Sequence, residues 1–268
     1  MNIRMSEPMN SHEPLAGRVA VVTGASRRAR IGYALARRLG MLGADLYLQG
    51  WRAHDAGWPW GEERDDAKTL TGDLKRETGS RVEYLEANFE DPNAPDIVIR
   101  GAVDAYGHAD ILVANHARAS ESDIDTLTVE GKDAQLAVDV RATVLLMQAF
   151  ALRHTGRPGG RVVLFTSTQH MEPHPGNLAY AVSKGAIHQM TLSFAQSLIH
   201  RGIVLNTVNP GPTDNSGYPQ EMIDDTGSFP QGRWGQPEDV ARLVGWLCTD
   251  DAQWVVGQVI NSEGGYRM

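Results

Sequence analysis

The chain has 268 residues, of which 41% are hydrophobic and 22% charged, and its formal net charge is -8 at pH 7. The length suits one large α/β domain, the acidic balance argues against nucleic acid as a partner, and no apolar run approaches the ~20 residues that cross a bilayer. One cysteine cannot form an internal disulfide, and the nine histidines lack the spacing of a helical zinc site, so we expect a metal-free protein of a reducing cytoplasm.

Residues 1–17 are polar and contain no apolar signal core, so we expect a disordered segment that ends before the first strand. Apolar, β-branched runs then alternate with helical patterns. The expected strands are 18–24, 44–50, 81–87, 109–115, 161–167, 203–209 and 257–265, and the expected helices are 31–42, 62–78, 94–106, 130–154, 180–201 and 237–248. This rhythm predicts a single α/β domain over residues 18–268, a Rossmann-type, doubly wound fold with a seven-stranded parallel sheet and helices on both faces.

Two irregular stretches interrupt the alternation. "GWRAHDAGWPWGEERDD" follows the second strand, and "NPGPTDNSGYPQEMIDDTGSFPQGRWG" follows the sixth. Long loops are uncommon in compact domains unless they are functional. We therefore expect the second stretch to form a substrate lid over about residues 211–233.

The first strand leads into the turn "TGASRRARIG" and then a helix, an arrangement that offers backbone N–H groups to a pyrophosphate. Gly24 can adopt the tight φ of such a turn, and Gly32 lets the helix pack closely on the strand. The middle glycine is missing, and three arginines stand in the turn. Taken alone, the motif fits either a modified dinucleotide cradle or a basic surface turn without a ligand.

A second pattern, "YAVSK", opens the helix after the fifth strand. Tyr180 and Lys184 are one helical turn apart, so their side chains share a face, where an ammonium favours the phenolate form of tyrosine. Ser167 ends the fifth strand, where its hydroxyl could hydrogen-bond a substrate oxygen beside the phenol. Tyr-x-x-x-Lys alone is common by chance, and it is the serine that favours an acid/base site.

Taken together, these motifs resemble the short-chain dehydrogenase/reductase family over residues 18–266, with members similar to β-ketoacyl-acyl-carrier-protein reductases as the nearest group. The matching segments are "TGASRRARIG", "ADILVANHA", Ser167, "YAVSK", "NPGPTD", "GRWGQPEDVARLVGWLC" and "GQVINSEGG". The resemblance implies that Tyr180 is the proton donor or acceptor. It also implies that Lys184 binds the nicotinamide ribose and supports the tyrosine, while Ser167 positions the substrate carbonyl.

The same resemblance implies a nicotinamide cofactor. The residues expected to bind it are Gly24, Ser26, Arg27, Arg28, Gly32, Asn88, Asn115, Tyr180, Lys184, Pro210, Gly211 and Thr213. Guanidinium groups in the turn suit a 2′-phosphate, and the second strand ends without the acidic residue that binds a free ribose 2′-hydroxyl. NADP(H) is therefore favoured, although Asp55 could fold back to that position, which keeps NAD(H) open.

The sequence departs from the family pattern at three places. The segment from Thr23 to Gly32 is two residues longer than the usual TGxxxGxG turn. Asp139 replaces the family's fourth catalytic residue, an asparagine that holds a water beside the lysine; it is expected either to take over that task or to face solvent as an ordinary helix residue. "ANHARA" replaces the usual "NNAG", and we interpret His116 as a packing residue.

The function implied is NADPH-dependent reduction of a ketone or 3-oxoacyl-type carbonyl, with Tyr180 as proton donor. Ser167, Tyr180, His170 and Met171 are expected to contact the small carbonyl or alcohol substrate. Two alternatives stay open: an NAD-linked alcohol dehydrogenase and a cofactor-sensing protein that has lost catalysis. The resemblance also implies a homotetramer or homodimer, without a nucleic-acid or membrane partner.

Overall fold

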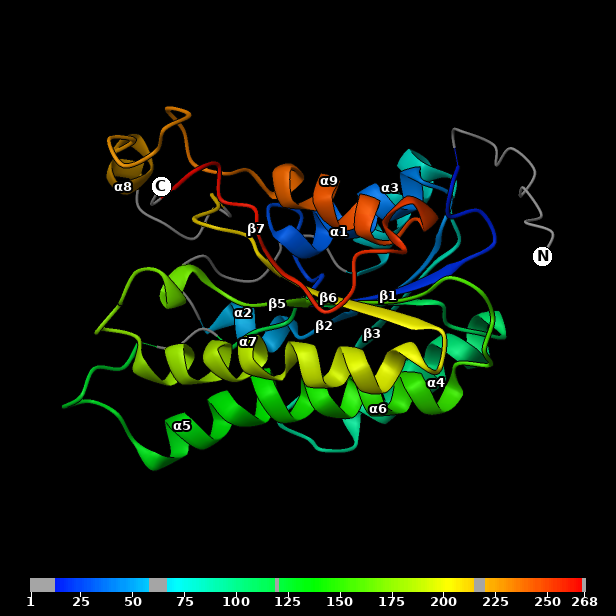
Figure 1. Ribbon diagram of the computed structural model, residues 1–268, viewed down its shortest axis with the longest axis horizontal. Helices are drawn as coiled ribbons and strands as arrows, with labels where there is room; N and C mark the ends of the chain where they lie inside the picture. Colours follow the sequence, from blue (N-terminus) through cyan, green and yellow to red (C-terminus); the bar gives the residue numbers. More distant parts are fainter. Residues whose placement is uncertain (1–12, 58–66, 119–120, 215–219, 267–268) are drawn as a thin grey trace.

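The structure is a computed structural model that describes residues 13–57, 67–118, 121–214 and 220–266 (Figure 1). Seven parallel strands form one sheet in the order β3-β2-β1-β4-β5-β6-β7, which confirms the predicted fold. The strands are β1 (Val19–Thr23), β2 (Asp45–Gly50), β3 (Val82–Glu86), β4 (Ile111–Ala114), β5 (Gly160–Phe165), β6 (Ile203–Asn209) and β7 (Val259–Asn261).

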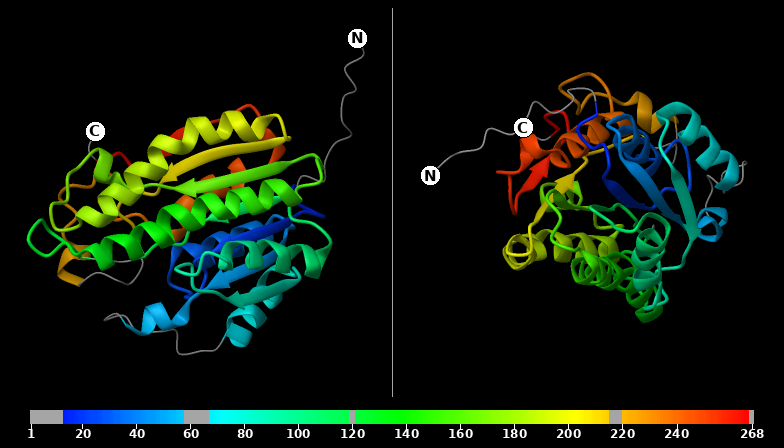
Figure 2. Two further views of the ribbon diagram at one scale, coloured as in Figure 1. Left: turned by 90° about the horizontal axis from the view of Figure 1, so that it is seen from below. Right: turned by 90° about the vertical axis from the view of Figure 1, so that its right-hand side faces the viewer.

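Helices cover both faces of this sheet (Figures 1 and 2). The helices are α1 (Ile31–Met41), α2 (Arg52–Ala56), α3 (Ala67–Thr78), α4 (Ala94–Tyr106), α5 (Val129–Leu136), α6 (Ala142–Arg153), α7 (Leu178–Ile199), α8 (Gln220–Asp224) and α9 (Pro237–Leu247), with short turns η1 (Ala137–Arg141), η2 (Thr168–His170) and η3 (Asp250–Ala252). One buried cluster joins α1, α3 and α9 to the sheet, and a second joins α4, α6 and α7 to its other face. Every residue of β1, β4, β5 and β6 is buried, as expected for strands covered on both sides.

The order of the strands indicates where on the sheet a ligand would bind. The chain runs from β1 outward through β2 to β3, then crosses to β4 on the other side of β1. This reversal is the topological switch point at which open parallel sheets bind ligands, beyond the carboxyl ends of the strands. The expected site residues after β1, β4, β5 and β6 therefore meet at one edge.

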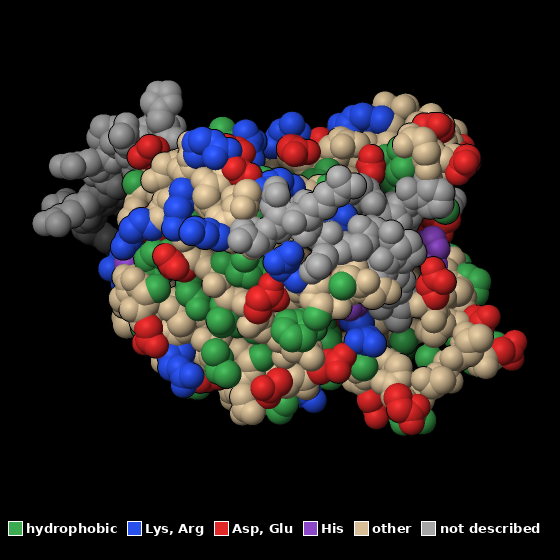
Figure 3. All heavy atoms as spheres, turned by 180° about the vertical axis from the view of Figure 1, so that it is seen from behind, with side chains coloured by type: hydrophobic (Ala, Val, Ile, Leu, Met, Phe, Trp, Pro, Cys, Tyr) green, Lys and Arg blue, Asp and Glu red, His purple; other side chains and the backbone are tan. Residues whose placement is uncertain are grey.

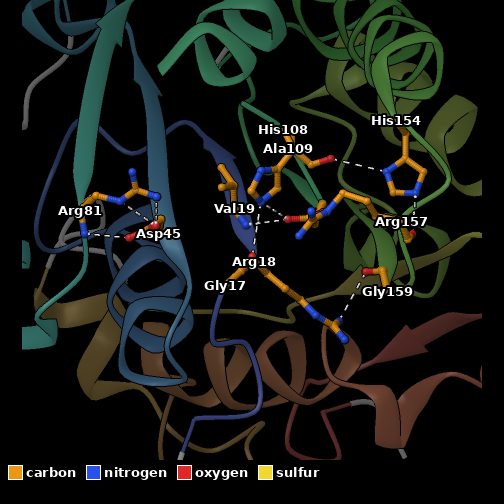
Figure 4. Close-up of polar contacts among 11 residues, drawn as sticks. Gly17, Arg18, Val19, Asp45, Arg81, His108, Ala109, His154, Arg157 and Gly159 are labelled. Atoms are coloured by element: carbon orange, nitrogen blue, oxygen red, sulfur yellow. Dashed lines mark hydrogen bonds and ion pairs between the residues drawn. The ribbon is translucent and has the colours of Figure 1, made fainter. Parts of the chain in front are cut away.

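The opposite edge is held by ion pairs and hydrogen bonds (Figure 4). The buried carboxylate of Asp110 accepts a hydrogen bond from the Val19 N–H (2.9 Å) and pairs with His108 (3.1 Å) and Arg157 (3.2 Å). Arg81 likewise pairs with Asp45. These contacts stabilise the amino ends of the strands, opposite the carboxyl ends at which a ligand is expected.

The layer of α1, α3 and α9 carries basic and acidic side chains together (Figure 3). Arg37 pairs with Glu77 across α1 and α3, and Arg76 pairs with Asp73 within α3. Because these pairs are exposed, each contributes little to stability. In each of these pairs a positive charge stands beside a negative one.

The helix expected over 130–154 contains a π turn that its sequence pattern does not reveal. The run is α5, then η1, then α6, and the N–H of Ala142 donates to the carbonyl of Ala137 five residues earlier. By length and composition, the run Val129–Arg153 would also be apolar enough to cross a membrane. Here its apolar side packs in the core, where Leu146 and Phe150 are buried.

The expected boundaries need two corrections. Residues 1–12 lie outside the described part, but Leu15 is fully buried and its N–H donates to the Leu42 carbonyl, so the domain begins before Arg18. The stretch after β2 includes the helix α2, whereas its residues 58–66 lie outside the described ranges, as does the start of the helix expected from 62.

Candidate active site

The turn after β1 is packed so closely that its two glycines are required. Gly24 has φ +70°, and a Cβ there would lie 2.9 Å from the Cα of His116. A Cβ on Gly32 would collide with the carbonyl oxygen of Gly24. Asn115, which follows β4, donates from Nδ2 to the carbonyls of Thr23 (3.1 Å) and Gly24 (3.2 Å). The turn is thereby fixed over the amino end of α1, where Arg30 supplies no side-chain cap.

Two polar residues of this turn bind carboxylates on neighbouring helices, Arg28 one on α3 and Ser26 one on α2. Arg28 donates from Nε (3.1 Å) and Nη2 (2.5 Å) to Asp73 on α3, and these hydrogen bonds lower the pKa of the Asp73 carboxyl. Asp55 on α2 does fold back to the turn and accepts a hydrogen bond of 2.6 Å from the Ser26 hydroxyl. A carboxylate and a guanidinium thus stand beside the same end of the cradle.

Ser167, Tyr180 and Lys184 come together at the carboxyl end of β5. Ser167 follows β5 by two residues and is the N-cap residue of η2, where its side chain makes no capping hydrogen bond. Tyr180 and Lys184 lie in the first turns of α7. The Nζ of Lys184 is 5.4 Å from the centre of the Tyr180 ring and donates to the Phe165 carbonyl at 3.1 Å. A cavity of about 80 Å³ adjoins Lys184; Thr166, Ser167, Gln169, His170, Ala181 and Gly185 complete its lining.

The side chain of Lys184 is shielded from solvent, with 5% of its surface exposed. Burial lowers the pKa of Lys184, and the negative charge of Asp139 opposes that shift. A lysine with a lowered pKa beside a phenol is an arrangement found at acid/base sites.

Asp139 lies in the π turn η1 and is 1% exposed, so the interpretation as a solvent-facing helix residue is wrong. Its Oδ2 accepts hydrogen bonds from the Ser183 hydroxyl (2.7 Å) and the Gln135 Nε2 (2.6 Å), while Oδ1 accepts from the Arg118 N–H (2.8 Å). Both oxygens are therefore held by donors of the chain itself. Ser183, the residue before Lys184, connects this carboxylate to α7.

His116 packs as expected, since its ring lies 4.4 Å from that of Phe89. It also has a polar role that sequence reasoning missed. Nδ1 is 2.7 Å from the Thr23 hydroxyl and Nε2 is 3.1 Å from the Val138 carbonyl. Burial lowers the pKa of His116 to about 3, so the ring is neutral.

The expected substrate residues stand after β5. His170 donates from Nδ1 to the Ser167 carbonyl (2.7 Å), and its ring contacts that of His188 at 4.9 Å. The sulfur of Met171 accepts a hydrogen bond of 3.4 Å from Asn261, just before the C-terminal tail. These contacts hold the segment after Ser167 at the ligand edge.

The remaining expected cofactor residues follow β3 and β6. Asn88 accepts a hydrogen bond from the Glu90 N–H (3.0 Å). Thr213 donates to the Pro210 carbonyl (3.2 Å) and forms a bridge with Gly235, while the Gly211 N–H donates to Asn209 (3.1 Å). All of them lie at the carboxyl edge of the sheet, on either side of the strands that carry Ser167 and Asn115.

The segment expected to be a lid is tied to the C-terminal tail. The Phe229 ring contacts Trp234 (5.2 Å) and Tyr266 (5.0 Å), and the Tyr266 hydroxyl donates to Glu172 (2.5 Å) after η2. Sequence reasoning missed Glu172, Trp234 and Tyr266, which take part in these contacts between the expected lid and the C-terminal residues. Residues 215–219 of the expected lid lie outside the described ranges.

Comparison with known proteins agrees with this fold. The family model described as "Enoyl-(Acyl carrier protein) reductase" matches residues 24–267. The uncharacterized oxidoreductase YjdA of Bacillus subtilis is 35% identical over 252 residues, which cover 93% of this chain and 96% of that protein. An NADPH-dependent aldehyde reductase-like protein of Arabidopsis thaliana is 34% identical, covering 94% and 95%.

Among solved structures, a short-chain dehydrogenase from Burkholderia cenocepacia in complex with NADP has a TM-score of 0.84 and 30% identity, covering 96% of this chain and 100% of that one. The chain therefore belongs to the short-chain dehydrogenase/reductase family. It is an oxidoreductase of the class that acts on CH–OH and C=O groups.

Proposed function

We propose that this oxidoreductase reduces a ketone or 3-oxoacyl-type carbonyl with NADPH, and that Ser167, Tyr180 and Lys184 carry out the reaction. The observation that carries the proposal is the buried amino group of Lys184 beside the Tyr180 ring, near the end of β5, which Ser167 follows. The printed name of the Arabidopsis relative and the NADP complex of the Burkholderia enzyme support the choice of cofactor.

The residues present fit a dinucleotide. Gly24 and Gly32 let the turn after β1 pack closely against the start of α1, where a Cβ would collide with neighbouring backbone, and the N-cap residue Arg30 makes no side-chain capping hydrogen bond there. Gly24, Ser26, Arg27, Arg28, Gly32, Asn88 and Asn115 would hold the adenosine and pyrophosphate, and Tyr180, Lys184, Pro210, Gly211 and Thr213 the nicotinamide half. The bound cofactor supplies the hydride.

The chain's own groups manage the substrate oxygen and its proton. The Ser167 hydroxyl donates a hydrogen bond to the carbonyl oxygen and orients it. The Tyr180 hydroxyl gives its proton to that oxygen as negative charge develops on it. Lys184 uses one N–H for the Phe165 carbonyl, so two N–H bonds serve the ribose and stabilise the phenolate that Tyr180 becomes.

The adenosine end of the proposed site would decide between the two cofactors, and two opposite charges next to the turn after β1 bear on that choice. Arg28 would have to share its guanidinium between Asp73 and a 2′-phosphate, while Asp55 would repel that phosphate or accept a hydrogen bond from a free 2′-hydroxyl. This contact of Asp55 with Ser26 is the observation that favours the second candidate, an NAD-linked alcohol dehydrogenase using the same residues in reverse.

We expect Asp55→Asn to strengthen NADPH binding about tenfold relative to NADH, because removing one like charge from a phosphate site changes the binding free energy by about 1.4 kcal/mol. Arg28→Ala is expected to shift the preference about as far in the opposite direction. Dissociation constants from fluorescence titration of each variant with both cofactors check this. Equal changes for both cofactors would mean that neither side chain faces the 2′ position.

Asp139→Asn is expected to lower both activity and stability, contrary to what replacing it with the family residue would suggest. An amide has one acceptor oxygen, whereas Asp139 accepts three hydrogen bonds on two oxygens. The new NH₂ group would face donors, and an unsatisfied buried polar group costs about 1–3 kcal/mol. Urea unfolding and kcat of the variant test this, and wild-type values for both would show that Gln135 and Ser183 readjust without cost.

One experiment separates the proposed function from its alternatives. Purified protein is titrated with NADPH and NADH and then supplied with ketones, aldehydes and 3-oxoacyl thioesters, and in parallel with alcohols and NAD⁺ or NADP⁺, and absorbance reports oxidation or reduction of the cofactor. Turnover that prefers NADPH supports the reductase, and turnover of alcohols with NAD supports the dehydrogenase. Tight cofactor binding without turnover of any substrate would contradict both and leave a sensor.

The proposal includes a homotetramer or homodimer in the cytoplasm. It is supported by the exposed apolar side chains of the outer helices, among them Leu152 on α6 and Val182 and Leu192 on α7, which are 69%, 59% and 68% exposed. Light scattering that gives a monomer at micromolar concentration would refute the assembly.

A further inference from the structure

His116 joins two parts of the site that are far apart in the sequence. Its Nδ1 contacts the hydroxyl of Thr23 at the end of β1, where the cofactor turn begins. Its Nε2 contacts the carbonyl of Val138 inside the π turn η1, one residue before Asp139. The ring lies between these contacts, 7% exposed and packed on Phe89.

The hydrogen-bond partners define one tautomer of this ring. Val138 offers a carbonyl, which can only accept, so the proton is on Nε2. With its proton on Nε2, the ring can only accept at Nδ1. The Thr23 hydroxyl therefore donates to Nδ1 at 2.7 Å, which is a shorter contact than that to its other acceptor, the Val113 carbonyl at 3.4 Å. A neutral imidazole that donates on one side and accepts on the other satisfies both contacts.

The π turn needs such partners because its wider hydrogen-bond spacing takes backbone carbonyls away from their ordinary helical donors. Two side chains supply donors there. His116 donates to the Val138 carbonyl, and the Thr143 hydroxyl donates to the Asp139 carbonyl at 2.6 Å. The Asp139 side chain then points to Ser183, next to Lys184.

We infer that His116 is a positioning residue, which holds the π turn in register with the cofactor turn and thereby fixes Asp139, Ser183 and the start of α7. The inference rests on the proposed function only for its effect on catalysis. The family pattern "NNAG" has an alanine at this position, and an alanine side chain can make neither of these two hydrogen bonds.

The test uses His116→Phe, which keeps an aromatic ring against Phe89 but removes both hydrogen bonds. We expect amide hydrogen exchange in residues 137–143 of the cofactor-free protein to become at least tenfold faster, while exchange in β5 and β6 is unchanged. With substrate and NADPH, kcat is expected to fall about tenfold and its pH profile to shift, because Lys184 and Tyr180 lose their fixed relation to Asp139. KM for the carbonyl substrate is expected to change less than twofold.

His154→Phe is the matched control. The ring of His154 also stacks on a phenylalanine, Phe150 at 5.6 Å, and its nitrogens contact the carbonyls of Ala109 (3.5 Å) and Arg157 (3.1 Å) at the opposite end of the sheet (Figure 4). We expect it to leave exchange in residues 137–143 and the pH profile of kcat as in wild type. Equal effects of the two variants would reduce His116 to a general packing residue and overturn the inference.

Thr23→Val provides a second route if His116→Phe does not fold, because it removes the hydroxyl while keeping the side-chain shape. Faster exchange in residues 137–143, across the site from the substitution, supports the link. Wild-type exchange there in either variant overturns it. Since exchange is measured without cofactor or substrate, failure of this inference is distinguishable from failure of the proposed function.

Discussion

Tyr180→Phe is expected to lower kcat by about 10²–10⁴-fold, the usual contribution of a general acid, while the dissociation constant for NADPH changes less than twofold. The substitution removes the hydroxyl that protonates the substrate oxygen and leaves the ring beside the Lys184 ammonium in place. Steady-state reduction of a carbonyl substrate gives kcat, and fluorescence titration gives the dissociation constant.

Tyr106→Phe is the matched control for this change. The Tyr106 hydroxyl donates to the Leu46 carbonyl at 2.9 Å, between α4 and the sheet, and is no part of the site. We expect this variant to lose about 1 kcal/mol of stability, the net value of one hydrogen bond, with wild-type kcat. A Tyr180→Phe enzyme that keeps more than a tenth of wild-type kcat would refute the assignment of Tyr180 as the proton donor.

Lys184→Met is expected to reduce kcat/KM by at least a hundredfold and to weaken NADPH binding about tenfold. The ammonium is assigned two tasks, holding the ribose and stabilising the phenolate, and methionine performs neither. Unchanged affinity for NADPH would contradict the first task. Lys75→Met, at an exposed lysine of α3, should change neither quantity.

The same variant should unfold at a temperature equal to or above that of wild type near pH 7. Because burial lowers the pKa of Lys184 below its unfolded value, the charged form costs stability at any pH below the folded pKa, and that cost disappears as pH rises toward the unfolded pKa. Wild type should therefore gain stability relative to Lys184→Met in alkaline solution. Calorimetry at several pH values measures this difference, and a large loss of stability at pH 7 would show that the charge is structural.

The fold could be predicted because local signals repeat along the chain. Continuous apolar runs marked β1, β4, β5 and β6, which are buried throughout, and the periodic stretches between them formed the crossover helices. The π turn at 137–141 could not be predicted, since the donor to its Val138 carbonyl, His116, comes from another loop. The burial of Leu15 could not be predicted from local periodicity either, because Leu15 is held against the end of α1.

The position of the candidate site residues at the ends of the strands could be predicted, but their contacts could not. Ser167, Tyr180 and Lys184 follow strand ends or share a helix face, which is local information. The partners of Asp139 are not local: Ser183 is 44 residues away and Arg118 is 21 residues away in the other direction. The ion pair of Arg28 with Asp73 spans 45 residues, so a sequence pattern that assigns Arg28 to a phosphate contains no sign of its competitor.

In the proposed reaction, hydride passes from NADPH to a carbonyl carbon while Tyr180 protonates the oxygen. This proposal is tested most directly by incubating the protein with NADPH that carries deuterium as the transferable hydride, together with the ketones, aldehydes and 3-oxoacyl thioesters above, and analysing the products by mass spectrometry. We predict an alcohol with one deuterium on the carbinol carbon, formed by wild type and by Tyr106→Phe but reduced at least a hundredfold in rate by Tyr180→Phe. Labelled alcohol formed equally fast by Tyr180→Phe, or no labelled alcohol from wild type saturated with NADPH, would contradict the account.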